Sequence, residues 1–117
     1  MIMGTCLSGT TTINYNDTTP PDRKCILLIP ASLTVTSFDN KAVNWTTDSG
    51  WASVKIPEGN HVFTLNYMGT DKNPPYKQEN IRYEFAGFVA GKTYKMYTEE
   101  AISQNSRILH IKMKLEP

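Results

Sequence analysis

Apolar and polar residues alternate along much of the chain after residue 23, and this period of two predicts β-strands. The clearest example runs from Val54 to Tyr67, where two alternating segments flank the triplet Pro57-Glu58-Gly59. Proline lacks an N–H and glycine tolerates a positive φ, so the triplet predicts a sharp turn. We therefore expect a β-hairpin with its corner at Gly59. The side chains after the corner that should share one face are His61, Phe63, Leu65 and Tyr67.

Turn signals recur along the rest of the chain, among them Asp39-Asn40 and Ala90-Gly91-Lys92. Only the segment from Glu99 to Ser106 has room for a single helical turn. This layout favours an all-β fold, a sandwich or a barrel. The expected strands are Lys24–Ile29, Ser32–Phe38, Ala42–Thr46, Trp51–Ile56, His61–Tyr67, Ile81–Val89, Thr93–Glu99 and Arg107–Leu115.

The first 22 residues differ in composition from the rest. They hold few large apolar residues after Leu7 and are rich in Thr, Asn, Ser, Gly and Pro. Such a segment buries too little apolar area to offset the entropy of ordering it. We expect a flexible tether over residues 1–22 and one β-sandwich domain over residues 23–117.

Within this tether, Cys6 follows a small-residue pair and precedes a polar stretch, as at the end of a bacterial lipoprotein signal peptide. Thr5 stands where Gly or Ala is more usual, and the charged and apolar regions of such a signal do not precede it. The alternatives to a lipidated Cys6 are a disulfide between Cys6 and Cys25 or two free thiols.

Composition excludes several classes of function. The 117 residues, of 13.2 kDa, suffice for one domain, and a net charge of +1 gives no strong field for nucleic acid or an acidic membrane. The longest apolar run, residues 25–29, is far below the roughly 18–20 residues that span a bilayer. The two cysteines lack the spacing of a zinc site or a redox pair, so we expect no cofactor and no metal.

Few residues point to catalysis. His61 and His110 are the only histidines, and neither is spaced from an acid and a nucleophile as a small hydrolase would require. The adjacent Glu99 and Glu100 should point to opposite faces of a strand. We therefore expect no enzyme, with a small hydrolase as the last alternative.

Aromatic residues are the better candidates for ligand contact. Trp45 and Trp51 flank one turn, and if Ala52 faces the core then Trp51 faces outward. An outward Trp51 beside Tyr67 or Tyr76 could stack on a sugar ring or on a partner's side chain. This gives the alternative function of a carbohydrate-binding module.

The pattern Val54-x-Ile-Pro-x-Gly-x-His61, followed by an alternating strand and by Phe85-x-x-x-x-Ala90-Gly-Lys-x-Tyr94, resembles PEGA-like domains of bacterial envelope lipoproteins. The resemblance covers about half of the chain, and the turn residues Pro57, Gly59 and Gly91 match best. It implies an antiparallel sandwich of immunoglobulin-like build with seven to eight strands. It also implies a non-catalytic interaction or structural module in the periplasm or on the outer membrane, and not in the cytoplasm. The expected partners are an envelope protein or a carbohydrate, with no nucleic acid, and the membrane only through the lipid anchor.

Overall fold

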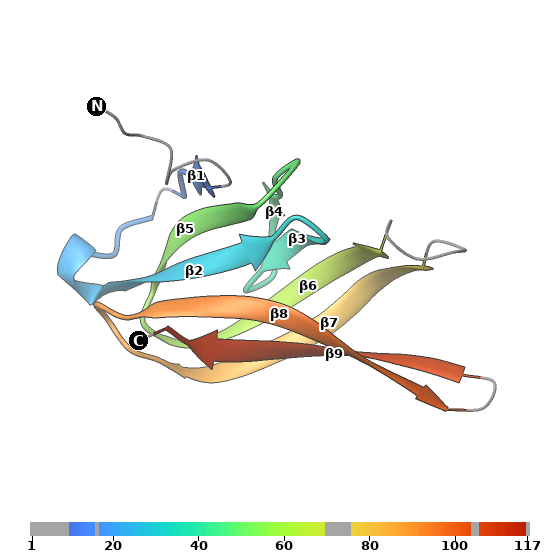
Figure 1. Ribbon diagram of the computed structural model, residues 1–117. Helices are drawn as coiled ribbons and strands as arrows, with labels where there is room; N and C mark the ends of the chain where they lie inside the picture. The colour runs from blue at the N-terminus through green and yellow to red at the C-terminus, as the bar shows by residue number, and fades with distance from the viewer. Residues whose placement is uncertain (1–9, 16, 70–75, 104–105, 117) are drawn as a thin grey trace.

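The computed structural model describes residues 10–15, 17–69, 76–103 and 106–116 and is nearly all β in this range (Figure 1). The single helical element there is a 3-10 turn, η2, at Pro21–Arg23. All eight expected strands are present, and one unexpected strand precedes them. The strands are β1 (Thr10–Ile13), β2 (Lys24–Pro30), β3 (Leu33–Phe38), β4 (Lys41–Trp45), β5 (Trp51–Pro57), β6 (Gly59–Gly69), β7 (Tyr76–Phe88), β8 (Thr93–Ser103) and β9 (Ser106–Leu115).

The strands form two sheets. Sheet A has the order β1-β5-β2-β8-β9, and sheet B has the order β4-β3-β6-β7. Most neighbours are antiparallel, as expected, but β1 pairs with β5 and β2 pairs with β8 in parallel. Sheet A is therefore mixed, whereas sheet B is antiparallel throughout. The chain returns to sheet A from sheet B at β5 and again at β8.

One cluster of buried side chains is shared by the two sheets, since both contribute alternate residues to it. In β5 the expected inward residues are at most 1% exposed, and in β6 the expected face of four residues is buried throughout. A register shift in β3 between Val35 and Ser37 adds one residue, which turns Phe38 to the same side as Val35. The buried residues in β5 are Ala52, Val54 and Ile56, and those in β6 are His61, Phe63, Leu65 and Tyr67.

The segment around Gly59 corrects the expected hairpin. β5 belongs to sheet A and β6 to sheet B, so the two strands do not pair, and the turn carries the chain from one sheet to the other. The expected positive φ is present, at 111° for Gly59. Nothing lies within 4 Å of a Cβ built there, so the backbone conformation and not lack of space favours glycine. Gly91, with φ 82°, makes the corresponding turn into β8.

The two tryptophans are separated for the same reason. Trp45 ends β4 in sheet B and is 3% exposed, whereas Trp51 begins β5 in sheet A and is half-buried. The turn between Trp45 and Trp51 joins the two sheets, so the two residues are not partners across a hairpin.

Part of the segment expected to be a tether has regular structure in the described residues. Residues 10–13 form β1, in register with residues 51–54 of β5. The Tyr15 ring packs edge-on against Phe38 and Trp45, at centroid distances of 5.4 and 5.2 Å. Strand pairing and one aromatic ring thus supply the contacts that composition did not indicate. Cys6 and the other residues before Thr10 lie outside the described part of the chain.

The described residues of the region expected to hold a helical turn are also strand. β8 continues to Ser103 and pairs with β9 up to Ser106. The β6–β7 and β8–β9 pairs are the longest in the molecule, and both extend beyond the body in Figure 1.

Candidate functional site

Two of the aromatic residues expected to form a ligand platform, Trp51 and Tyr67, do not share a surface. The Tyr67 side chain is 5% exposed in the core and its hydroxyl donates to Glu100 Oε1 at 3.2 Å. Trp51 faces outward from sheet A, as expected, but Lys95 Nζ lies 4.5 Å from its ring centroid. The backbone of Tyr76 pairs with Gly69 in sheet B, while its side chain lies outside the described residues. The burial of Tyr67 removes this residue from the expected stacking platform.

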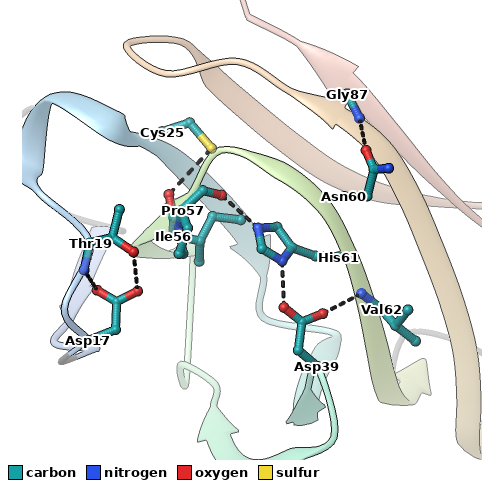
Figure 2. A network of polar contacts seen from close by, with 10 residues as sticks. All are labelled: Asp17, Thr19, Cys25, Asp39, Ile56, Pro57, Asn60, His61, Val62 and Gly87. Atoms are coloured by element: carbon teal, nitrogen blue, oxygen red, sulfur yellow. Dashed lines mark hydrogen bonds and ion pairs between the residues drawn. The ribbon is translucent and has the colours of Figure 1, made fainter.

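His61 is held in a polar network at the corner between β5 and β6 (Figure 2). Its Nδ1 lies 2.6 Å from Asp39 Oδ2 and its Nε2 lies 2.7 Å from the Pro57 carbonyl oxygen. Asp39 Oδ1 accepts from the Val62 N–H at 2.9 Å. A carbonyl and an ionised carboxylate only accept, so both contacts are satisfied when each ring nitrogen carries a proton. The network joins the β3–β4 turn to the corner, a packing and hydrogen-bonding role.

The β3–β4 turn itself explains why Asp39 can reach His61. Asp39 and Asn40 have φ of 50° and 67°, the two positive values of a two-residue hairpin turn. Aspartate and asparagine tolerate this conformation better than most residues. The turn places the Asp39 carboxylate over β6, where it accepts both hydrogen bonds.

Cys25 is a free thiol in the core and is 1% exposed. Its Sγ donates to the Ile56 carbonyl oxygen at 3.7 Å (Figure 2). Burial raises the pKa of the Cys25 thiol to about 11. Because the thiolate is the reactive form, Cys25 acts as a small core residue at neutral pH.

Glu99 and Glu100 point to opposite faces of β8, as expected. Glu99 points outward toward Lys112, with 3.5 Å between its Oε1 and the lysine Nζ, whereas Glu100 contacts the buried Tyr67. His110 stands exposed opposite Glu99 on β9. Within the described ranges, no group of three or more His, Cys, Asp or Glu side chains is placed to hold a metal. No helix among the described residues is long and apolar enough to cross a membrane.

The outer face of sheet A is the most distinctive surface. Alternation turns lysines outward from β2, β5, β8 and β9, and Lys92 joins them from the turn before β8. We call this surface the lysine face. Half-buried Ile26, Leu28, Trp51 and Tyr97 lie among its lysines. Those lysines are Lys24, Lys55, Lys92, Lys95, Lys112 and Lys114.

Strand register fixes the arrangement of this face. Ile26 lies between Lys55 of β5 and Thr93 of β8. Two residues further on, Leu28 lies between Ser53 and Lys95. The lysine face is therefore an apolar strip along β2 with lysines on both sides.

Three lysines of the face have an acidic partner. Lys95 Nζ lies 3.4 Å from Glu116 Oε1, Lys112 pairs with Glu99, and Lys24 Nζ lies 2.9 Å from Asp17 Oδ1. The other three pair with no acid among the residues that the structure describes. They are Lys55, Lys92 and Lys114, which are all exposed.

The Asp17–Lys24 pair fastens the N-terminal segment to sheet A. Both side chains are largely buried, 16% and 14% exposed. Burial alone raises the pKa of Asp17, but hydrogen bonds from Lys24 and Thr19 outweigh it and hold this pKa below its ordinary value of 3.8. The pair keeps Lys24 in place beside the hollows of the face.

Two hollows in the lysine face meet at Lys24 and Lys55, which line both. The larger, about 400 Å³, lies between β5 and the segment that follows β1. The smaller, about 180 Å³, lies toward the turn before β8. Together they make one groove across three strands, which we call the lysine groove. Its further lining residues include Thr12, Asn14, Tyr15, Ser53, Ile26 and Lys92.

The outer face of sheet B has a different chemistry. Its central strand β6 presents Val62, Thr64 and Asn66. The charged residues of β7 occur in opposite-sign pairs, Lys77 with Glu79 and Arg82 with Glu84. The described part of this face therefore has no excess of one sign.

Sequence reasoning identified Trp51 on the lysine face but missed the lysines. A net charge of +1 averages over both sheets and conceals their separation. Alternation alone does put Lys112 and Lys114 on the same side of β9. The missing information was which strands are neighbours, because only the sheet order brings Lys24, Lys55 and Lys95 to the same surface.

Comparison of the chain with protein-family models, with curated proteins and with solved structures found no match.

Proposed function

We propose that this chain is a non-catalytic interaction domain of a bacterial cell envelope and that its partner binds on the lysine face. The observation that carries the proposal is the segregation of unpaired lysines and half-buried apolar side chains onto one sheet. Surfaces that combine charge with partly exposed apolar residues are typical of binding sites. The outer face of sheet B also presents the apolar Val62 and Met68, but the charges of its strand β7 are paired with opposite charges.

The rest of the proposal follows the resemblance to PEGA-like domains. The two sheets with a shared core agree with a sandwich of immunoglobulin-like build, and a lipid on Cys6 would hold the domain at the periplasmic or outer surface. The chain is expected to need no cofactor and to bind no nucleic acid. In its own host, expressed from its full reading frame, the protein should incorporate labelled fatty acid, and Cys6→Ser should not. Unlabelled wild-type protein would end the lipid-anchor part of the proposal.

Photo-crosslinking tests the binding surface. A photoreactive amino acid is placed at Ser53, on the lysine face, or at the matched control position Thr64, on the outer face of sheet B. Both residues are half-buried strand residues, so neither change should unfold the domain. We expect adducts in intact cells from position 53 and few from position 64. Adducts from position 64 alone would place the partner on sheet B and contradict the proposal.

A further inference from the structure

The lysine groove is rich in hydrogen-bond donors and has no acid in its lining. The residues that line its two hollows include the ammonium groups of Lys24, Lys55 and Lys92, the hydroxyls of Thr12 and Ser53, and no aspartate or glutamate. Asp17, a carboxylate beside the groove, is already bound to Lys24 and to Thr19. Ammonium groups without an acid partner favour an anionic ligand.

The shape of the groove favours a ligand that carries more than one acidic group. Lys55 and Thr93 stand on either side of Ile26 in one row across the sheet, about two strand spacings or roughly 10 Å apart. The backbone of Lys92, which precedes Thr93, is fixed by the hydrogen bond from the Ile26 N–H to its carbonyl oxygen at 2.9 Å. Two unpaired lysines, Lys55 and Lys92, thus flank an apolar floor. A chain with repeating acidic groups can contact both.

The backbone around the groove argues against a peptide ligand. β5, β2 and β8 are interior strands of sheet A, paired on both sides. Their N–H and C=O groups are used within the sheet, so an extended peptide lying over them finds no edge to join. Among the described strands at the groove only β1 has an open edge, and that edge is on the side away from β5. Thr12, Asn14 and Ser53 instead offer hydroxyl and amide groups, which suit the hydroxyls of a polyol.

The concave shape argues against a lipid bilayer. A hollow of about 400 Å³ between β5 and the segment after β1 is open to a single polymer chain. A flat bilayer surface would instead contact the exposed lysines at the rim. The groove chemistry therefore fits a slender, hydroxylated and acidic chain.

We propose that the lysine groove binds an acidic glycopolymer, a polyol chain that bears regularly spaced carboxylate or phosphate groups. Lys55 and Lys92 contact successive acidic groups, Lys24 is held by Asp17 between the two hollows, and Ser53, Thr12 and Asn14 bind hydroxyls. This inference rests on the proposed function, since it names the class of ligand for the same face.

Calorimetric titration of the full chain tests the class of ligand. The probes are polygalacturonate, which carries carboxylates, poly(glycerol phosphate), which carries phosphates, and neutral dextran. We expect one or both acidic polymers to bind, and we expect salt to weaken this binding. The difference between the two polymers shows whether the groove prefers carboxylates or phosphates. Binding to neither would overturn the inference. So would binding only to poly-glutamate or to phosphatidylglycerol vesicles, which would assign the site to an acidic protein or to a membrane.

A charge-matched pair of variants tests the site. In K55E/K92E the groove loses its two unpaired ammonium groups, whereas K41E/K77E changes the net charge equally on exposed positions of sheet B. We expect K55E/K92E to weaken binding by about tenfold or more and K41E/K77E to retain near wild-type affinity. Backbone amide NMR spectra check that both variants keep the fold. An equal loss of affinity in both double variants would show that the polymer is attracted by net charge alone, and this would overturn the assignment of the site to the groove.

The two proposals can fail separately. If crosslinks in cells stay at position 53 while no acidic polymer binds, the face is correct and the ligand class is wrong. If crosslinks move to position 64, the proposed function itself fails.

Discussion

The two sheets share one core but have different outer faces. Most inward residues of both are apolar, and those at the centre are fully buried, including Val54 in sheet A and Phe63 in sheet B. Outward, sheet B pairs each described charge of β7 with its opposite, while sheet A sets Lys95 directly across from Lys114. Like charges in cross-strand positions reduce stability. This arrangement of lysines is what the proposed binding role of the lysine face requires, and four sets of variants can break or sharpen the comparison.

The largest effect should come from the shared core. Phe63→Ala removes a fully buried ring between the sheets and should cost about 3–5 kcal/mol in the free energy of unfolding. Its neighbour Thr64 points outward from sheet B, so Thr64→Ala should cost only about 0.5 kcal/mol. Chemical denaturation measures both. Similar costs for the two would mean that the outer face of sheet B is also buried, and the contrast between the faces would fail.

The next effect concerns the corner that joins the sheets. Asp39→Ala removes the acceptor for the His61 ring and for the Val62 N–H, and should cost roughly 1–3 kcal/mol. Asp39→Asn keeps an acceptor oxygen and a residue that tolerates the positive φ of 50°, so it should cost less. Thermal and urea unfolding of the two variants test this order. If the asparagine variant were the less stable one, the carboxylate charge would matter more than the turn.

A smaller effect should appear in the N-terminal segment, which covers part of the lysine face. The pKa of Asp17 is lowered in the folded protein, so its contribution to stability is complete above the ordinary value of 3.8. This contribution to stability is lost as the pH falls below 3.8 and the carboxylate is protonated. Asp17→Asn should therefore speed amide exchange of β1 by an amount equivalent to roughly 1 kcal/mol at neutral pH, and the difference from wild type should vanish in acid. A difference that persists unchanged at pH 2 would show that the charge of Asp17 is not what fastens the segment.

The smallest effect should be a gain in stability. Lys114→Glu replaces the facing lysines with an opposite-charge pair and should raise the free energy of unfolding by about 0.2–1 kcal/mol. Lys41→Glu is the control, because Phe38 and not a lysine lies across from it. If Lys114→Glu destabilised the domain, Lys114 would serve the fold, and the argument that this face is arranged for binding would lose its support.

The alternation of apolar and polar residues predicted the strands and their buried faces, but it could not predict which strands pair. Period-two alternation correctly gave the buried face of β6 and the outward position of Trp51, since each depends only on neighbours in sequence. The same pattern could not show that Gly59 joins two sheets, because a hairpin and a crossing use the same turn residues. β1 was missed since its Thr-rich sequence has little apolar area, and its order comes from contacts with β5 and from Tyr15. The lysine face depends on sheet order, so no single segment could indicate it.

Lysine acetylation footprinting in the cell envelope tests the central claim most directly, because it needs no knowledge of the partner. Intact cells and the purified protein are treated with the same acetylating reagent, and each modified lysine is quantified by mass spectrometry. We expect Lys55, Lys92 and Lys114 to be acetylated more slowly in cells than in the purified protein. Lys41 and Lys77, exposed on sheet B, should react equally in both. Protection of Lys41 and Lys77 without protection of the lysine face would contradict the account.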